Sequence, residues 1–284
     1  MIPAAVQRVP TVQYRGAFAA LDRAVAEETP VALTYNRLTH AVMMATPTDL
    51  EDFAVGFSRS EGIIRHAAEI EDLEIVAAEN GGVECRMWIG TEHMERLEQR
   101  RRSLAGPTGC GLCGLESLAE AVRTPPTVTE AGRITAAELQ HAIAAMPDLQ
   151  TLNLETRAVH AAAFWRRGDG IMALREDVGR HNALDKLSGA LARAGIEGGC
   201  GIVTMTSRIS VELVQKAAVL GVPILVAVSA PTLLALRVAE AAGMTLVGIA
   251  RRDGFEIFTH PHRIEQHQSV AEPLKSLANL PQLP

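Results

Sequence analysis

The sequence predicts an α/β protein in two parts, a smaller strand-rich α+β part at the N-terminus and a larger layered α/β domain after it. From about residue 156, short apolar segments alternate with segments of helical periodicity, which is typical of a sheet covered by helices. Before that point the apolar segments come in pairs around short polar turns, as hairpin strands do. We therefore expect a first part at 1–125, the α/β domain at 126–264 and an irregular tail at 265–284.

The length and composition are those of an ordinary globular protein. The chain has 284 residues, of which 48% are hydrophobic and 21% charged, enough for a substantial core. Its net charge of −6 argues against a nucleic-acid-binding protein. We see no signal peptide, and the longest apolar run, 221–230, is too short to cross a bilayer, so we expect no membrane association. The four cysteines fit a reducing cytoplasm better than a disulfide scaffold.

The first part is expected to hold a loose leader, two strand pairs and one helix. The leader covers 1–15, and the strand pairs are 31–35 with 40–46 and 73–78 with 83–89. The helix begins near Thr48, whose hydroxyl can cap it, has acidic residues in its first turn and extends to Gly62. Cys85 alternates with Val83 and Met87, which favours a buried structural thiol.

Two cysteines occur three residues apart in the glycine-rich segment Gly109-Cys110-Gly111-Leu112-Cys113-Gly114. A charged helix is expected before it, at 91–102, and another after it, at 115–122. A thiol between a glycine-rich loop and a helix N-terminus has a lowered pKa and forms thiolate. The spacing alone leaves three possibilities open: half of a zinc site, a redox pair, or two thiols that share the handling of one sulfur atom.

The second part alternates strands and helices after a capped helix. The pattern Thr135-Ala136-Ala137-Glu138 predicts the start of that helix, which extends to Met146. The expected strands are 160–165, 171–175, 200–205, 223–228, 245–250 and 256–259. The expected helices are 177–194, 210–220 and 231–241.

Polar residues follow the strands at the positions where ligands of open α/β sheets bind. They form four sets, at 175–182, 206–210, 229–232 and 251–254. Each offers arginines or hydroxyls together with backbone N–H groups, which is a combination typical of phosphate binding. Any one of these residues can also be an ordinary helix cap. The usual glycine-rich mononucleotide and dinucleotide loops are absent from the sequence.

Two segments together resemble one known family. Arg175-Glu176-Asp177-Val178-Gly179-Arg180-His181-Asn182-Ala183-Leu184-Asp185-Lys186 and Cys110-Gly111-Leu112-Cys113-Gly114 are similar to motifs of the formate dehydrogenase accessory sulfurtransferases, the FdhD/NarQ family. The resemblance covers about residues 28–264. It implies a cytidine-deaminase-like layered α/β domain in a homodimer, with the two cysteines on a mobile loop.

The resemblance also implies a function. Sulfur taken from a cysteine desulfurase is carried as a cysteine persulfide and passed to the molybdenum bis(molybdopterin guanine dinucleotide) cofactor of formate dehydrogenase. Persulfide exchange requires an accessible thiolate. Cys110 is the expected carrier and Cys113 its partner, which either relays the sulfur or protects Cys110. The cofactor is thus a bound substrate, GDP-like nucleotides are expected mimics of it, and no zinc or other metal is expected.

The same resemblance implies which residues contact the cofactor. The best candidates are Ile249, Ala250, Arg251, Arg252, Asp253 and Gly254. Asp177, Arg180 and His181 are expected to shape the same pocket, together with Ser207, Arg208 and Ser229. His181 is either a proton donor or a hydrogen-bonding residue that holds the turn. The chain departs from the family where Arg157-Ala158 replaces the usual Gly-Gly and where Ser207 replaces a glycine.

Two other functions compete with sulfur transfer. A zinc-dependent deaminase needs H-x-E and a later P-C-x-x-C. Here Ala162 stands where the glutamate would be, and the cysteine pair precedes His160, which disfavours deamination. A chaperone that binds the cofactor and docks formate dehydrogenase without carrying sulfur is the other alternative.

Overall fold

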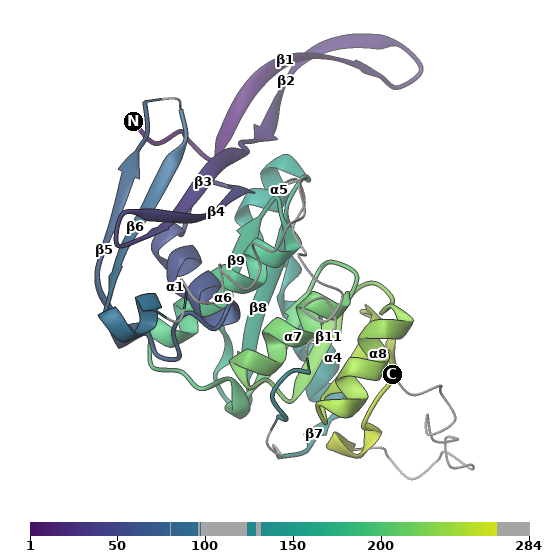
Figure 1. Ribbon diagram of the computed structural model, residues 1–284. Helices are drawn as coiled ribbons and strands as arrows, with labels where there is room; N and C mark the ends of the chain where they lie inside the picture. Colours follow the sequence, from purple (N-terminus) through teal and green to yellow (C-terminus); the bar gives the residue numbers. More distant parts are fainter. Residues whose placement is uncertain (80, 96, 98–123, 129–131, 266–284) are drawn as a thin grey trace. The chain divides into compact units, whose positions relative to one another are not determined.

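The computed structural model describes residues 1–79, 81–95, 97, 124–128 and 132–265 (Figure 1). The chain divides into two compact units. Unit 1 comprises 1–94, 147–162 and 174–193, and unit 2 comprises 95–146, 163–173 and 194–284. These units differ from the contiguous parts expected at 1–125 and 126–264, because the chain returns to unit 1 at residues 147 and 174.

In its described residues, unit 1 contains an antiparallel two-stranded ribbon, a mixed four-stranded sheet, three α-helices and two short 3-10 helices. Its elements are β1 (Val6–Tyr14), β2 (Phe18–Ala26), β3 (Thr29–Tyr35), β4 (Leu38–Ala45), α1 (Leu50–Ser60), η1 (Ala67–Glu69), β5 (Ile70–Ala77), β6 (Val83–Ile89), η2 (Pro147–Leu149), α5 (Thr151–Thr156) and α6 (Arg180–Arg193). Two further strands, β8 (His160–Arg166) and β9 (Gly170–Asp177), contribute residues to both units.

The expected leader at 1–15 is wrong, because β1 pairs along its whole length with β2 in an antiparallel ribbon. The purple ribbon in Figure 1 shows this pairing. Its apolar side chains, such as Val12 at 67% exposure, are spread among polar ones, so the strand lacks the apolar run of a buried strand.

The two expected strand pairs are confirmed and form one four-stranded sheet of order β4-β3-β6-β5. The turn between β3 and β4 is the two-residue pair Asn36 and Arg37, both with positive φ, as tight hairpins require. β3 and β6 run parallel and join the two hairpins. Cys85 of β6 is fully buried, as predicted, and burial raises the pKa of its thiol to about 12.

Helices α1 and α6 lie side by side (Figure 1) and cross at two glycines. A Cβ at Gly56 of α1 would collide with the Asp185 carbonyl, and one at Gly189 of α6 would collide with the Asp52 carbonyl. The close approach of the two backbones therefore depends on both residues lacking a side chain.

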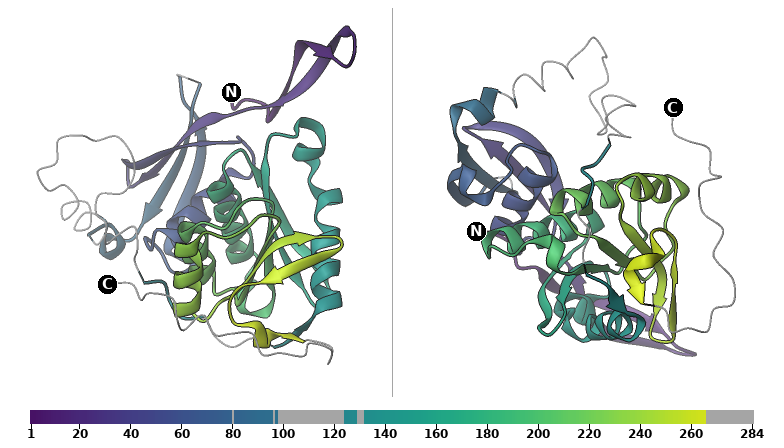
Figure 2. Two further views of the ribbon diagram at one scale, coloured as in Figure 1. Left: turned by 90° about the vertical axis from the view of Figure 1, so that its right-hand side faces the viewer. Right: turned by 90° about the horizontal axis from the view of Figure 1, so that it is seen from below.

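Unit 2 is built on parallel strands with crossover helices. Its elements are β7 (Ile134–Thr135), α4 (Ala136–Ala145), η3 (Gly198–Cys200), β10 (Ile202–Met205), α7 (Val211–Leu220), β11 (Ile224–Ala227), α8 (Leu233–Ala241), β12 (Thr245–Arg251), β13 (Gly254–Ile257), η4 (Pro261–Arg263) and β14 (Ile264–Glu265). The six-stranded sheet has the order β13-β12-β11-β10-β8-β9. β10, β11 and β12 are parallel, and the yellow hairpin of β12 and β13 in Figure 2 ends the sheet.

The core of unit 2 lies between this sheet and α4. It contains Leu139 and Ile143 of α4 with Trp165, Ile202 and Val247 of the sheet. The predicted capping box is confirmed, since Glu138 N donates to Thr135 Oγ1 at 3.2 Å and Thr135 N donates to Glu138 Oε2 at 2.9 Å. In the described part of the chain, no helix is long and apolar enough to span a bilayer.

Several expected bounds need correction. The helix expected at 177–194 begins at Arg180, because β9 continues to Asp177. The N-cap of α1 is Asp49 rather than Thr48, whose hydroxyl is buried without a partner among the described residues. The expected helix at 91–102 is described only at 91–95 and 97, where it is helical. The helix expected at 115–122 and the tail from 266 lie outside the described residues.

Candidate functional site

The two cysteines expected to carry sulfur, Cys110 and Cys113, lie outside the described residues. The other predicted site residues fall into two groups. Asp177, Arg180 and His181 belong to unit 1, and the remaining nine belong to unit 2. Each group is described by itself.

The unit 2 group lies in three segments that backbone hydrogen bonds join: the loops after the parallel strands β10 and β11, and the end of β12 with its turn into β13. Val228 N donates to Met205 O at 3.0 Å, Thr232 N donates to Ile209 O at 3.0 Å, and Ile249 N donates to the Ser229 carbonyl at 3.3 Å. The structure therefore brings the three predicted loops together at the carboxyl ends of the strands, where open α/β sheets bind ligands.

The residues of the first two loops differ in what they offer a ligand. Ser207 is buried at 3% exposure, and its hydroxyl donates to the Arg208 carbonyl at 3.0 Å, so this serine shapes the loop. Arg208 is exposed and Ser229 is half-buried. Arg208 is thus the charged group that this part of the site presents to solvent.

The third segment, 249–254, comprises the end of β12 and the turn into β13, and its backbone is unusual. Ile249 has φ 51°, and the register of β12 with β13 shifts between Gly248 and Arg251. A β-branched residue in the left-handed region is strained, which occurs most often at functional positions. At Gly248 a Cβ would lie 2.9 Å from Phe258 and from Pro231 Cδ, so only glycine fits between these loops.

The side chains of this loop do not all face the same way. Ala250 is 2% exposed and packs in the core of unit 2, so its side chain faces away from any ligand. Arg251 donates to the carbonyls of Val228 and Ala250. Arg252 and Asp253 are exposed at the turn into β13. Three exposed arginines, at 208, 251 and 252, therefore belong to hydrogen-bonded loops, and guanidinium groups bind phosphate oxygens well.

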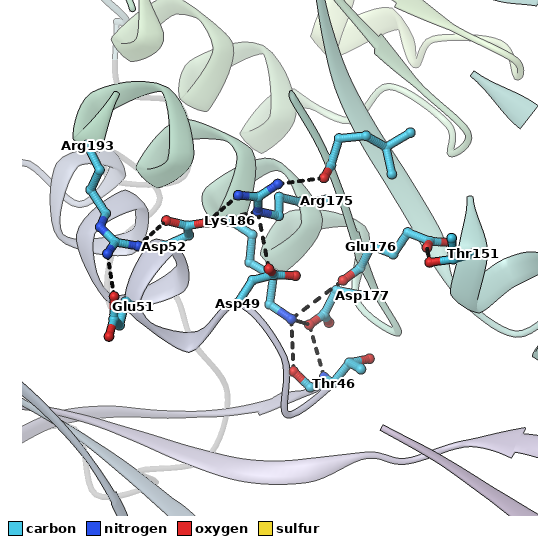
Figure 3. A network of polar contacts seen from close by, with 11 residues as sticks. Thr46, Asp49, Glu51, Asp52, Thr151, Arg175, Glu176, Asp177, Lys186 and Arg193 are labelled. Carbon is cyan, nitrogen blue, oxygen red and sulfur yellow. Dashed lines mark hydrogen bonds and ion pairs between the residues drawn. The ribbon is translucent and has the colours of Figure 1, made fainter. Parts of the chain in front are cut away.

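Of the unit 1 group, Asp177 lies in the polar network of Figure 3, to which Arg175, Glu176 and Lys186 also belong. Lys186 Nζ lies 2.7 Å from the Asp177 carboxylate, and neither side chain has any exposed surface. Lys186 also donates to the carbonyl of Thr46 at 2.8 Å. A buried charge is tolerated only when paired and hydrogen-bonded, and this pair meets both conditions.

Among the described residues, Asp177 forms its hydrogen bonds and its ion pair within its own unit, and these contacts account for both carboxylate oxygens. Oδ2 accepts from Thr46 N at 2.9 Å, and Oδ1 accepts from Gly179 N at 2.7 Å and Asn182 Nδ2 at 2.9 Å. Asp177 therefore holds the turn between β9 and α6 in place.

The two residues before Asp177 also have structural partners. The Glu176 carboxylate accepts from Leu152 N and Asn153 N at 2.8 Å each and so caps helix α5. Arg175 bonds Asp52 at 2.7 Å, and Asp52 in turn accepts from Arg193 at 2.6 Å. These contacts join β9, α1 and α6 within unit 1 (Figure 3).

Arg180 and His181 form the first turn of α6, and both are half-buried. His160, at the start of β8, lies close enough to Arg180 to be affected by its charge. Burial and then the positive charge of Arg180 lower the pKa of His160, so its neutral form is favoured. His160 and Lys186 were not among the predicted site residues. Lys186 is buried in α6, and no pattern within a few residues of it indicates that its partner is Asp177.

Comparisons with known proteins place the chain in a family of accessory proteins. Residues 26–265 match the model of the FdhD/NarQ family, and the chain belongs to this family. A protein named sulfur carrier protein FdhD from Agrobacterium fabrum is 51% identical over 265 residues, which cover 93% of this chain and 97% of the relative. A protein of the same name from Cupriavidus necator is 51% identical over 87% of this chain and 85% of its own.

A solved structure supports the mixed α/β fold. The crystal structure of a protein described as a formate dehydrogenase accessory protein from Desulfotalea psychrophila matches with a TM-score of 0.70 and 27% identity. The match covers 92% of this chain and all of that chain.

Proposed function

We propose that this protein is a sulfur carrier. It takes sulfur from a cysteine desulfurase as a persulfide on Cys110 and delivers it to the molybdenum bis(molybdopterin guanine dinucleotide) cofactor before formate dehydrogenase receives that cofactor. Two things support the proposal: the relatives at about half identity are named sulfur carriers, and the chain contains the C-x-x-C pair. The structural observation that most supports cofactor binding is the set of segments after β10, after β11 and at the end of β12, which are hydrogen-bonded to one another and have exposed arginines.

The chemistry begins with a disulfide-type exchange. The Cys110 thiolate attacks the terminal sulfur of the donor's persulfide, the donor's S–S bond breaks, and the donor cysteine leaves as thiolate. Cys110 then bears the persulfide. When the Cys113 thiolate attacks the Cys110 sulfur, the terminal sulfur leaves as hydrosulfide and the two cysteines form a disulfide. Cys113 thereby supplies the electrons that reduce the sulfur, and a cellular dithiol must reduce the pair again.

The cofactor is cargo in this proposal, and the unit 2 loops are where its guanine dinucleotide arms bind. Arg208 and Arg252 are exposed, and Arg251 is held by carbonyl groups of its own and the neighbouring loop. Their guanidinium groups pair with phosphate oxygens, and the strained backbone at Ile249 presents the loop to the nucleotide. GDP-like nucleotides are expected to bind the same loops.

We further propose that the protein acts in the cytoplasm as a homodimeric sulfurtransferase with a cytidine-deaminase-like layered domain. Its partners are a cysteine desulfurase and formate dehydrogenase.

Intact mass after incubation with a cysteine desulfurase and L-cysteine tests the carrier step. The full chain is expected to gain the mass of one sulfur. Cys110→Ala is expected to lose this gain, whereas Cys113→Ala keeps it and fails only in delivery. If cells that carry Cys110→Ala still produce active formate dehydrogenase, sulfur transfer is refuted and the chaperone function remains.

Nucleotide binding tests the loops separately. Arg252→Gln is expected to weaken GDP binding, while Arg37→Gln, a matched loss of an exposed arginine in the β3–β4 turn, leaves it unchanged. Equal affinities of the two variants would remove the unit 2 loops from the proposed site.

A further inference from the structure

The antiparallel ribbon of β1 and β2 has one apolar face. Residues that pair directly across an antiparallel ribbon share a face, and the face alternates along each strand. The three pairs that follow one another on one face, counted from the tip, are Tyr14 with Phe18, Val12 with Ala20, and Pro10 with Asp22. These six residues are the apolar face of the ribbon, and Asp22 is the one charged residue among them.

The apolar face is the more exposed of the two faces. Val12, Tyr14 and Phe18 are 67%, 66% and 79% exposed, and the rings of Tyr14 and Phe18 lie against each other with centroids 5.1 Å apart. Thr11 and Gln13, which point to the opposite face, are half-buried. This is the reverse of the usual pattern, in which the polar face of a ribbon is turned to water. A large exposed apolar patch of this kind marks an interaction surface.

Unit 1 itself holds only the base of the ribbon. Arg8 pairs with Glu155 of α5 at 3.8 Å, Arg23 donates to the Thr156 carbonyl at 3.3 Å, and Ala24 is buried. From there the ribbon extends past the other elements of unit 1 (Figures 1 and 2). A two-stranded ribbon is at best marginally stable by itself in water, so its apolar face needs a cover that is present whenever the protein is folded.

The area of the apolar face is enough for a two-fold contact. An aromatic side chain has on the order of 200 Å² of surface, so Tyr14 and Phe18 together expose about 300 Å² in each chain. A two-fold interface buries this area on both copies. With Pro10, Val12 and Ala20 the total reaches about 1,000 Å², the size at which specific protein interfaces begin.

The ribbon has a hollow as well as a projecting aromatic pair. The hollow has a volume of about 410 Å³ and is lined by Pro10, Thr11, Val12, Ala20, Leu21 and Asp22. Four of these belong to the apolar face, and Thr11 and Leu21 form the pair between them, whereas their neighbours on the opposite face do not line the hollow. The hollow therefore lies on the apolar face, and its volume is in the range of pockets that enclose ring-containing ligands.

A two-fold axis through the pair Val12–Ala20 brings the two features together. When two apolar faces pack with their ribbons antiparallel about this axis, the aromatic pair of each copy comes opposite the hollow of the other. The exposed Arg15 at the tip then lies near Asp22 of the partner subunit. A contact between identical subunits requires a patch that is complementary to itself, and this patch matches itself in shape and in charge.

We propose that two copies of this chain associate through the apolar faces of their β1–β2 ribbons, with Tyr14 and Phe18 of each copy filling the hollow of the other. This inference rests on the homodimer of the proposed function and identifies its contact. The ribbon lies almost wholly outside residues 26–265, the part of the chain that matches the family model.

Sedimentation velocity of the full chain over a dilution series tests the proposal, because it measures the dissociation constant of the dimer. Phe18→Ser is expected to raise this constant by at least about 30-fold, the ratio that an aromatic side chain seated in an interface pocket supplies. Val42→Ser removes an apolar side chain that is 60% exposed on β4 and is the matched control, with the constant unchanged. Thermal unfolding identifies any variant that is not folded.

Charge reversal tests the register of the contact. Arg15→Asp and Asp22→Arg each place like charges opposite each other, and each is expected to raise the dissociation constant by about tenfold. The double variant Arg15→Asp/Asp22→Arg restores opposite charges and is expected to return to within about twofold of the unaltered protein. Within one ribbon these two residues are separated by about 13 Å of strand, so the recovery reports a contact between copies.

Four outcomes would overturn the proposal. An unaltered chain that stays monomeric at every concentration refutes both this contact and the homodimer. A dimer that is insensitive to Phe18→Ser refutes the contact alone, and a double charge variant that does not recover refutes its register. If Phe18→Ser instead weakens binding of formate dehydrogenase and leaves the dimer intact, the apolar face docks that enzyme. The mass gain at Cys110 tests sulfur transfer independently of all four.

Discussion

Lys186 and Asp177 form an ion pair of 2.7 Å in which both side chains are completely buried. The pair closes the turn between β9 and α6, and the Thr46 backbone binds both partners. The segment that resembles a family motif in the sequence is thus, in large part, a structural device. It holds Arg180 and His181 in the first turn of α6.

Removing one partner of this pair is expected to destabilise the protein severely. Lys186→Met leaves the Asp177 carboxylate buried without its counter-charge, which costs about 3–5 kcal/mol of unfolding free energy. The double variant Asp177→Asn/Lys186→Met is expected to lose less than the sum of the two single losses, because no charge remains buried. Urea unfolding followed by circular dichroism measures all three. Additive losses would show that the two side chains are not energetically coupled.

The glycines where α1 and α6 cross should not tolerate a methyl group. Gly56→Ala and Gly189→Ala each place a Cβ against the backbone of the other helix, so the helices must separate. We expect each to cost at least about 3 kcal/mol. Gly90→Ala, where a Cβ would meet only Glu71 Oε1 at 3.5 Å, is the control and should cost far less. The thermal midpoints of the three variants test this, and a similar small shift in all of them would argue against the close crossing.

The backbone strain at Ile249 predicts a stabilising substitution. Ile249→Gly removes the conflict between a β-branched side chain and φ 51°, and the residue is 40% exposed, so little buried area is lost. We expect a gain of about 1 kcal/mol in unfolding free energy. Val42→Gly, at an exposed strand position with ordinary φ, should instead destabilise the protein, since glycine disfavours a strand. A loss of stability in Ile249→Gly would mean that the residue is not strained.

The capping box of α4 predicts a pH dependence. Hydrogen bonds from Arg167, followed by the Thr135 backbone N–H, lower the pKa of Glu138 to about 2. Because this value lies below the unfolded value of about 4.3, the stabilisation is complete above that value and is lost as the pH falls toward about 2.

Glu138→Gln tests the sign of this effect. In urea titrations it should lower the free energy of unfolding by about 1 kcal/mol at about pH 7, and the difference from the unaltered protein should shrink at about pH 3. Glu256→Gln, at an exposed position of β13, is the control and should show neither effect. A difference that grows as the pH falls would contradict the assigned pKa direction.

Much of the fold could be predicted because its signals are local. The Asn36-Arg37 turn, the Thr135 capping box and the alternation of apolar segments with helices each depend on residues within a few positions of one another. The same holds for the loops after β10, β11 and β12, because parallel strands must place their carboxyl ends at one edge.

Helix α5 illustrates what local signals miss. Its N-cap, Gln150, makes no side-chain capping bond, and the first N–H groups of the helix are capped by Glu176, which is 24 residues away from Leu152. The β1–β2 ribbon was likewise missed, since its side chains show no buried face.

By itself, the sequence determined the mixed α/β class, the family, the buried thiol of Cys85 and the polar segments after β10 and β11. Only the tertiary structure decided that Asp177 is buried against Lys186 and that β8 and β9 belong to both units. The physical reason is the separation along the chain. Thr46 and Asp177 are 131 residues apart, and no local pattern specifies which distant partner will satisfy a buried charge.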